Sequence, residues 1–137
     1  MRIIGRLHSS SSLLLLVGKW FVFWAVGIRQ LIAGLRQTIH PEFTTEGIFG
    51  IKSRDSLPIV QELGFANLSM GVRGALSIVD GRLVFPSAIA SGLFFGIAGI
   101  KHLTMKERNF AENVAMVSDL LLSAVLAICT VLKCFTT

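Results

Sequence analysis

The chain has 137 residues and a formal net charge of +5, and it is 53% hydrophobic and 15% charged. Soluble domains contain about 25% charged residues. The low charge content and a mean hydropathy of +0.71 argue against a soluble domain and indicate a membrane protein. The 13 basic residues are spread from Arg2 to Lys133 without a dense patch, so we expect no nucleic-acid partner.

Four apolar segments approach the length of about 20 residues that a helix needs to cross a bilayer. They cover about residues 13–35, 59–79, 83–100 and 114–135. The pattern predicts an all-α protein in which residues 1–137 form one integral membrane domain, built as a four-transmembrane-helix bundle. An even number of spans would place both termini on the same side of the membrane.

Two basic residues, Lys19 and Arg29, interrupt the first segment, and we expect their side chains to snorkel toward the membrane surfaces. Arg2 and Arg6 ahead of the "LLLLV" run also resemble the start of a signal peptide. Because Lys19 and two tryptophans break the apolar stretch, an uncleaved anchor is the preferred interpretation.

The distribution of basic residues favours an orientation with both termini outside the cytoplasm. The terminal side of the predicted bundle carries Arg2, Arg6, Arg82 and Lys133, whereas the opposite side carries Arg29, Arg36, Lys52, Arg54, Lys101, Lys106 and Arg108.

The connections between the segments differ in length. Asp80, Gly81 and Arg82 are typical of a tight turn, which would make the second and third segments antiparallel neighbours. The connection at about residues 36–57 mixes aromatic and aliphatic residues with polar ones, and it is expected to lie in the membrane interface between the first two helices.

Small residues recur at intervals of four in the third segment, at Ala88, Gly92 and Gly96, with Gly99 following. Such a ridge allows two membrane helices to approach closely. The second segment offers the matching small residues, which are Gly64, Gly71, Gly74 and Ala75. We therefore expect the second and third helices to pack against each other.

Five polar residues in or beside the apolar segments form the candidate site: Glu62, Asn67, His102, Asn113 and Asp119. In an antiparallel bundle they would gather near one membrane face, with Asp119 about 9 Å deeper than Asn113 at about 1.5 Å per residue. Polar groups in a bilayer are costly and usually face protein or water. The group could staple the helices together, bind a small ligand, or hold a proton or a metal ion.

The metal interpretation has little support from spacing. The chain lacks the Glu-x-x-His pairs of di-iron bundles, and Glu62, His102 and Asp119 on three helices do not form a recognised ligand motif. We also find no nucleophile elbow, phosphate-binding loop or dinucleotide fingerprint. We therefore predict no catalytic residue, no metal ligand and no cofactor.

Several stretches resemble a known group of proteins. They are "IHPEF" at 39–43, "QELGFANLSMGVRGALSI" at 61–78, "GIAGIKHL" at 96–103 and "NFAENVAMVSDLL" at 109–121. The chain resembles small prokaryotic four-helix integral membrane proteins of unknown function, which are DoxX-like in broad architecture. The resemblance implies a multi-pass protein of the prokaryotic cell membrane, and it brings no established activity.

The leading functional hypothesis is a non-enzymatic membrane protein, either an accessory subunit or a bundle that binds a small ligand. One alternative is a small transporter or proton-coupled factor that uses Glu62 or Asp119. Another is a membrane redox enzyme with a metal or haem at His102. The expected partners are the lipid bilayer, a small molecule, and further copies or other subunits of a membrane complex.

Overall fold

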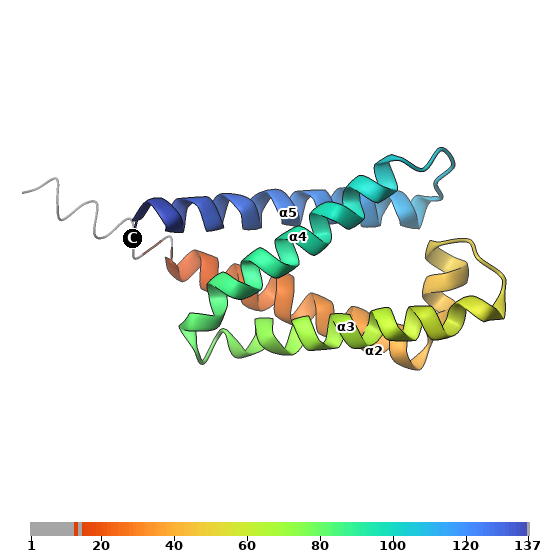
Figure 1. Cartoon of the computed structure of the whole chain (residues 1–137), viewed down its shortest axis with the longest axis horizontal. Helices are drawn as coiled ribbons and strands as arrows, with labels where there is room; N and C mark the ends of the chain where they lie inside the picture. Colours follow the sequence, from red (N-terminus) through yellow and green to blue (C-terminus); the bar gives the residue numbers. More distant parts are fainter. Residues whose placement is uncertain (1–12, 14, 137) are drawn as a thin grey trace, which may run out of the picture.

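The computed structural model describes residue 13 and residues 15–136, and the described part is helical without a strand (Figure 1). Arg2 and Arg6 therefore lie outside the described residues. The all-α expectation is confirmed. The first helix covers Leu15–Ile39 and contains the π-helix η1 (Val22–Ile28) and α2 (Arg29–Ile39). The later elements are η2 (Phe43–Ile48), η3 (Arg54–Ser56), α3 (Leu57–Leu76), η4 (Gly81–Leu83), α4 (Val84–Leu103) and α5 (Phe110–Thr136).

Within the described residues, three helical stretches are long and apolar enough to cross a membrane: Leu15–Ile39, Gly81–Leu103 and Phe110–Cys134. The helix α3 is not among them. Its 20 residues reach about 30 Å, which is long enough. However, its apolar sequence is interrupted by the polar residues Gln61, Glu62, Asn67, Ser69 and Arg73.

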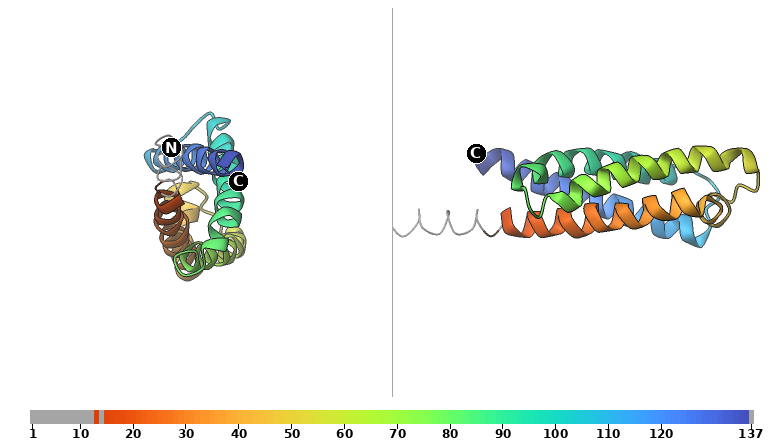
Figure 2. Two further views of the ribbon diagram at one scale, coloured as in Figure 1. Left: turned by 90° about the vertical axis from the view of Figure 1, so that its left-hand side faces the viewer. Right: turned by 90° about the horizontal axis from the view of Figure 1, so that it is seen from below.

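The helices form two pairs, with the first helix beside α3 and α4 beside α5 (Figures 1 and 2). In the first pair, glycine faces bring the two backbones together. A Cβ atom added at Gly27 would lie 2.6 Å from the backbone nitrogen of Ala75, and one added at Gly71 would lie 2.7 Å from that of Leu31. Gly34 and Gly64 make similarly close approaches between these helices.

In the second pair, the small residues of α4 face α5. The expectation that they would pack against the second helix, α3, was wrong. Gly92 and Gly96 face Leu126 and Ser123 of α5, and Ser123 Oγ donates a hydrogen bond of 2.9 Å to the carbonyl oxygen of Gly92. The ridge therefore packs against α5 and not against α3. Of the glycines of α3, Gly74 meets the backbone of Gly27 and Gly64 that of Gly34, while Gly71 meets Leu31.

The turn between α3 and α4 joins the two pairs. Asp80 accepts a hydrogen bond from the backbone nitrogen of Arg82 at 3.0 Å, and the Arg82 guanidinium also binds the carboxylate. The side-chain hydrogen bond from Arg82 lowers the pKa of Asp80, so this cap stays ionised to a lower pH than a free aspartate would.

A small apolar core lies between the pairs and consists of Val22, Val26, Ala88, Phe95 and Leu126. The beginning of the first helix and the end of α5 lie at the same end of the molecule (Figures 1 and 2). The connection that contains η2 and the loop before α5 lie at the opposite end (Figure 1).

The connection after the first helix folds back onto the bundle. Thr44 and Thr45 of η2 are buried, and the Thr45 hydroxyl donates to the carbonyl oxygens of Pro41 and Glu42. The Asn109 amide at the start of α5 donates 3.0 Å to the carbonyl oxygen of Ile48, which ties η2 to α5. Asn109 and Glu112 also form a reciprocal capping box, with bonds of 2.9 and 2.8 Å.

Candidate functional site

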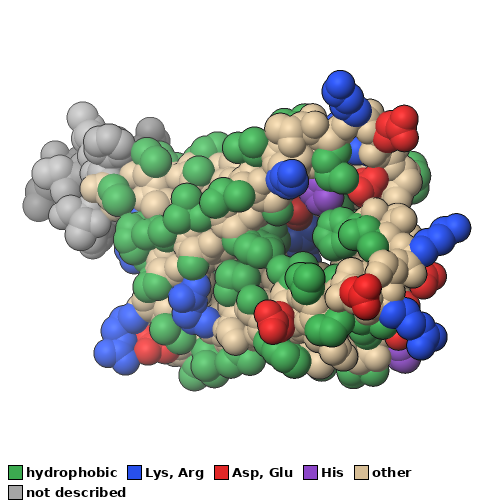
Figure 3. Space-filling model, turned by 45° about the vertical axis from the view of Figure 1, so that its right-hand side comes forward, with side chains coloured by type: hydrophobic (Ala, Val, Ile, Leu, Met, Phe, Trp, Pro, Cys, Tyr) green, Lys and Arg blue, Asp and Glu red, His purple; other side chains and the backbone are tan. Residues whose placement is uncertain are grey.

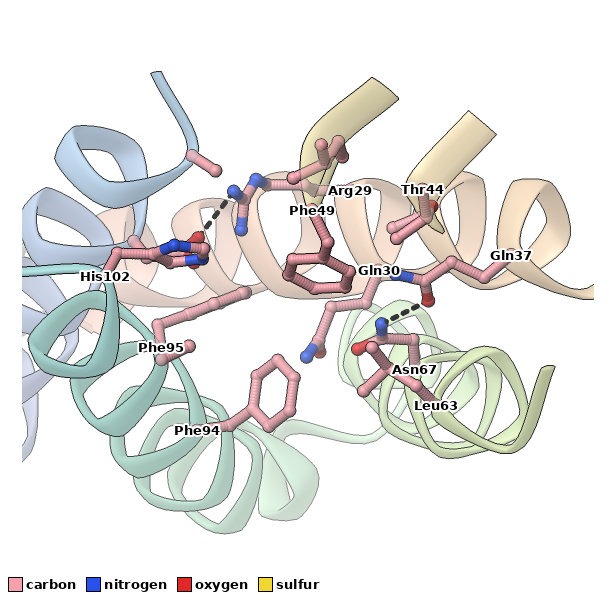
Figure 4. Close-up of a pocket in the computed structure, with 15 residues that line it drawn as sticks. Arg29, Gln30, Gln37, Thr44, Phe49, Leu63, Asn67, Phe94, Phe95 and His102 are labelled. Atoms are coloured by element: carbon pink, nitrogen blue, oxygen red, sulfur yellow. Dashed lines mark hydrogen bonds and ion pairs between the residues drawn. The ribbon is translucent and has the colours of Figure 1, made fainter. Parts of the chain in front are cut away.

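A cavity of about 210 Å³ lies between the two helix pairs, and η2 contributes Thr44 and Ile48 to its lining. The space-filling view shows a hollow on this face, in which basic, acidic and histidine side chains gather between apolar ones (Figure 3). The close-up shows how the lining side chains surround the space (Figure 4). They are Arg29, Gln30, Ala33, Gln37, Thr44, Ile48, Phe49, Leu63, Asn67, Phe94, Phe95, Ala98, His102, Ala115 and Asp119.

An ion pair between the first helix and α5 forms one wall. Arg29 Nη2 lies 2.7 Å from Asp119 Oδ1 and donates a second hydrogen bond of 3.0 Å to Ser118 Oγ. The guanidinium also lies 4.7 Å from the centre of the Phe95 ring, which suits a cation–π contact. Arg29 therefore does not snorkel as expected, because an acidic partner lies on the inner face of the neighbouring helix.

His102, in the last turn of α4, lies beside this wall. It is 8% exposed, and its ring stacks on Phe49 with 6.3 Å between centroids and 15° between planes. Its Nδ1 atom is buried and has no hydrogen-bond partner among the described residues. Buried polar atoms in proteins almost always have a hydrogen-bond partner. An atom without one can bind a molecule that enters the site.

The amide side chains of Asn67 and Gln37 form the opposite side of the cavity. Asn67 is 4% exposed, and its Nδ2 donates 2.7 Å to Gln37 Oε1. Asn67 Oδ1 is buried without a partner in the described part of the chain. Gln30 also lines the cavity, but both of its amide atoms are bonded. Its Oε1 accepts from Ser91 Oγ at 3.1 Å and its Nε2 donates to the sulfur of Met70 at 3.7 Å.

Three of the five candidate residues line this cavity: Asn67, His102 and Asp119. Glu62 does not, because it is five residues before Asn67, a rotation of about 140° around the helix that leaves it exposed. Asn113 is half-buried outside the lining and accepts a hydrogen bond of 3.0 Å from Arg108 Nε.

Sequence reasoning missed the contribution of the first helix and of η2. Gln30 and Gln37 are seven residues apart in an apolar helix, which places them on one face, and this spacing is the signal that could have revealed them. Nothing in the sequence pointed to Phe49, because the fold of the connection brings its ring to His102.

The geometry does not bring metal ligands together in the described part of the chain, where no group of three or more His, Cys, Asp or Glu side chains could hold an ion. Glu62 in particular does not join His102 and Asp119 around the cavity. The site instead combines one neutralised ion pair, two buried polar atoms without partners and three phenylalanine rings.

Comparison with known proteins identifies a family but no activity. No curated protein and no solved structure is detectably similar to the chain. The model of one family matches residues 3–136, and that family is described as a family of unknown function. The expectation of an uncharacterised family is thus confirmed, while the DoxX-like architecture stays a prediction. The chain belongs to the family of unknown function DUF6790.

Proposed function

We propose that the chain is a multi-pass integral membrane protein of the cell membrane whose inter-helix cavity binds a small molecule. The observation that carries this proposal is the pair of buried polar atoms without partners, Asn67 Oδ1 and His102 Nδ1, in the lining of one cavity. A structural staple would have both atoms bonded to neighbouring helices. Atoms that are left free inside a cavity are suited to bind a molecule from outside the chain.

The depth of two residues in the cavity lining supports a functional role. Asn67 is ten residues into α3 and Asp119 is nine residues into α5, which places both about 14 Å from the helix starts. If α3 crosses with the three apolar helices, this depth is near the middle of a hydrocarbon core about 30 Å thick. Polar residues there are costly and mark a functional site by default.

The outer surface supports a location in lipid. Only 11% of the residues in the apolar window of α5 are buried, and 28% in the windows of the first helix and α4. These faces would contact lipid, further copies of the chain or other subunits of a membrane complex.

Native mass spectrometry of the detergent-purified protein tests the proposal. We expect the wild type to carry a stoichiometric small molecule and Asn67→Leu and Asp119→Asn to lose it while remaining folded. Glu62→Gln is the matched control, because this residue lies on α3 outside the cavity, and it should keep the bound mass. A wild type without bound mass, or variants that all retain it, would contradict the proposal.

The position of the Asp119 carboxylate in the cavity lining favours one second candidate, a proton-coupled transporter. Asp119 lines the cavity and Glu62 does not, so Asp119 is the carboxylate that would change protonation during transport. Reconstituted vesicles with an imposed pH gradient would show proton-coupled solute uptake for the wild type and none for Asp119→Asn. Uptake that is equal in both would exclude this role of Asp119.

A further inference from the structure

The amide side chains of the cavity indicate what kind of molecule it takes. Resting on the proposed function, we infer that the ligand is an uncharged planar ring compound with a lactam-type or imide-type edge, in which an N–H donor and a carbonyl acceptor are adjacent. This edge binds Asn67 and Gln37, and the ring lies among the phenylalanine side chains.

The first step is the hydrogen-bonding capacity of the amide pair. The single bond of the pair joins Asn67 Nδ2 to Gln37 Oε1, each of which keeps further capacity, and the two amide atoms that take no part in it are the acceptor Asn67 Oδ1 and the donor Gln37 Nε2. Asn67 Oδ1 is buried without a partner, and no hydrogen bond of Gln37 Nε2 is found within the described residues. Exchanging nitrogen and oxygen in both amides would again leave one donor and one acceptor.

The second step concerns the side of the amide pair on which these two atoms lie. Figure 4 shows the free oxygen of Asn67 and the nitrogen of Gln37 on the side of the pair that faces the cavity. A ligand that offers only a donor or only an acceptor would leave one of the two amide groups unbonded. A lactam edge satisfies both at once.

The third step is shape and size. In the view of Figure 4, Phe49 lies between the amide pair and His102, and Phe94 lies below the end of the Gln30 side chain. Both rings line the cavity and provide apolar surfaces for a flat molecule. The cavity of about 210 Å³ exceeds the roughly 150 Å³ of an engineered cavity that binds benzene. The volume therefore suits a substituted ring or two small fused rings.

The fourth step is charge. The lining contains one arginine and one aspartate, Arg29 and Asp119, and no lysine or glutamate. The charges of Arg29 and Asp119 neutralise each other across 2.7 Å. Arg29 is further engaged by Ser118. No lysine, arginine, aspartate or glutamate of the lining is left to pair with an ionised ligand, whose burial would be costly, so a neutral molecule fits better.

Calorimetric titration of the full chain in lipid nanodiscs tests the inference with three probes of similar size. These are isoquinolin-1-one, which has the lactam edge, its N-methyl derivative, which lacks the donor, and naphthalene, which lacks both groups. Empty nanodiscs give the blank. We expect isoquinolin-1-one to bind at least about tenfold more tightly than the N-methyl derivative, the effect of one lost hydrogen bond to a buried group.

Variants locate the effect. Asn67→Leu and Gln37→Met should abolish the preference for the lactam, whereas Glu62→Gln should keep it. Because the comparison of the first two probes needs only the wild type, the inference can be tested even if a variant fails to fold.

The outcomes separate this inference from the proposed function. If all three probes bind equally, the lactam edge is wrong, while small-molecule binding by the cavity stands. If none binds, the inference is overturned, and the bound mass in native mass spectrometry decides the proposed function independently. A lactam preference that survives in Asn67→Leu and Gln37→Met overturns the assignment to the amide pair.

Discussion

The carboxylate of Asp119 and the guanidinium of Arg29 form an ion pair between the first helix and α5. The Asp119 side chain is 12% exposed and that of Arg29 36%. At low dielectric, removal of one partner leaves the other charge unpaired, and this costs more than the intact pair contributes. The pair therefore constrains how the first helix and α5 approach each other.

We expect Asp119→Leu to lower the free energy of unfolding by about 1 to 3 kcal/mol, less than the about 3 to 5 kcal/mol for a fully buried pair because Arg29 is partly exposed. The double variant Arg29→Met with Asp119→Leu should recover part of this loss, since no unpaired charge remains. Unfolding in mixed micelles would measure the cycle. Simple additivity of the single variants would show that the two residues are not coupled.

Much of the polar cluster could be predicted at the level of residues. Asn67, His102 and Asp119 stand out because polar side chains are rare in apolar helices, and all three line the cavity. Glu62 shows the limit of this reasoning, because the sequence alone did not reveal which face of α3 meets the first helix. The assignment of Gln37 as the partner of Asn67 depends on that pairing, and the assignment of Arg29 as the partner of Asp119 depends on how the first helix meets α5.

Among the elements, the closest contact is the one between the first helix and α3. Gly27 meets the backbone of Ala75, and Gly74 meets the backbone of Gly27 in return. The sequence predicted the helices themselves, since apolar length and turn residues are local signals. It did not predict their partners, because several helices carry small residues and close approach depends on matched positions in two helices at once.

We expect Gly27→Ala to destabilise the protein by about 1 to 3 kcal/mol, because its Cβ would lie 2.6 Å from a backbone atom that cannot move aside easily. Gly18→Ala in the same helix is the matched control. A Cβ there meets nothing within 4 Å, and alanine favours the helix, so its stability should be unchanged or higher. Thermal unfolding in detergent compares the two. Equal melting temperatures would contradict the proposed importance of this contact.

For the whole molecule, we predict that α3 crosses the membrane with the three more apolar helices. Its outer face carries exposed apolar residues such as Phe65, Val72 and Leu76, which suits contact with lipid. Its inner face supplies Asn67 to the cavity. A polar inner face lowers the mean hydropathy of a helix without preventing it from spanning.

Labelling of single cysteines in sealed vesicles would settle the topology, after replacement of Cys129 and Cys134. With four spans, Lys52→Cys and Lys106→Cys should react from one side and Gly81→Cys from the other. The distribution of basic residues predicts that the first two lie on the cytoplasmic side. Reaction of Lys52→Cys and Gly81→Cys from the same side would show that α3 does not cross.

The pairing of the helices has a consequence for how the protein is assembled. Each pair is a hairpin of neighbouring segments, so its contacts are close in sequence and can form soon after synthesis, before the other hairpin is present. The cavity contains residues from both hairpins, and it therefore exists only after they dock. The contact between the two hairpins is therefore completed last. A ligand bound in the cavity would contact both hairpins and stabilise the docked state.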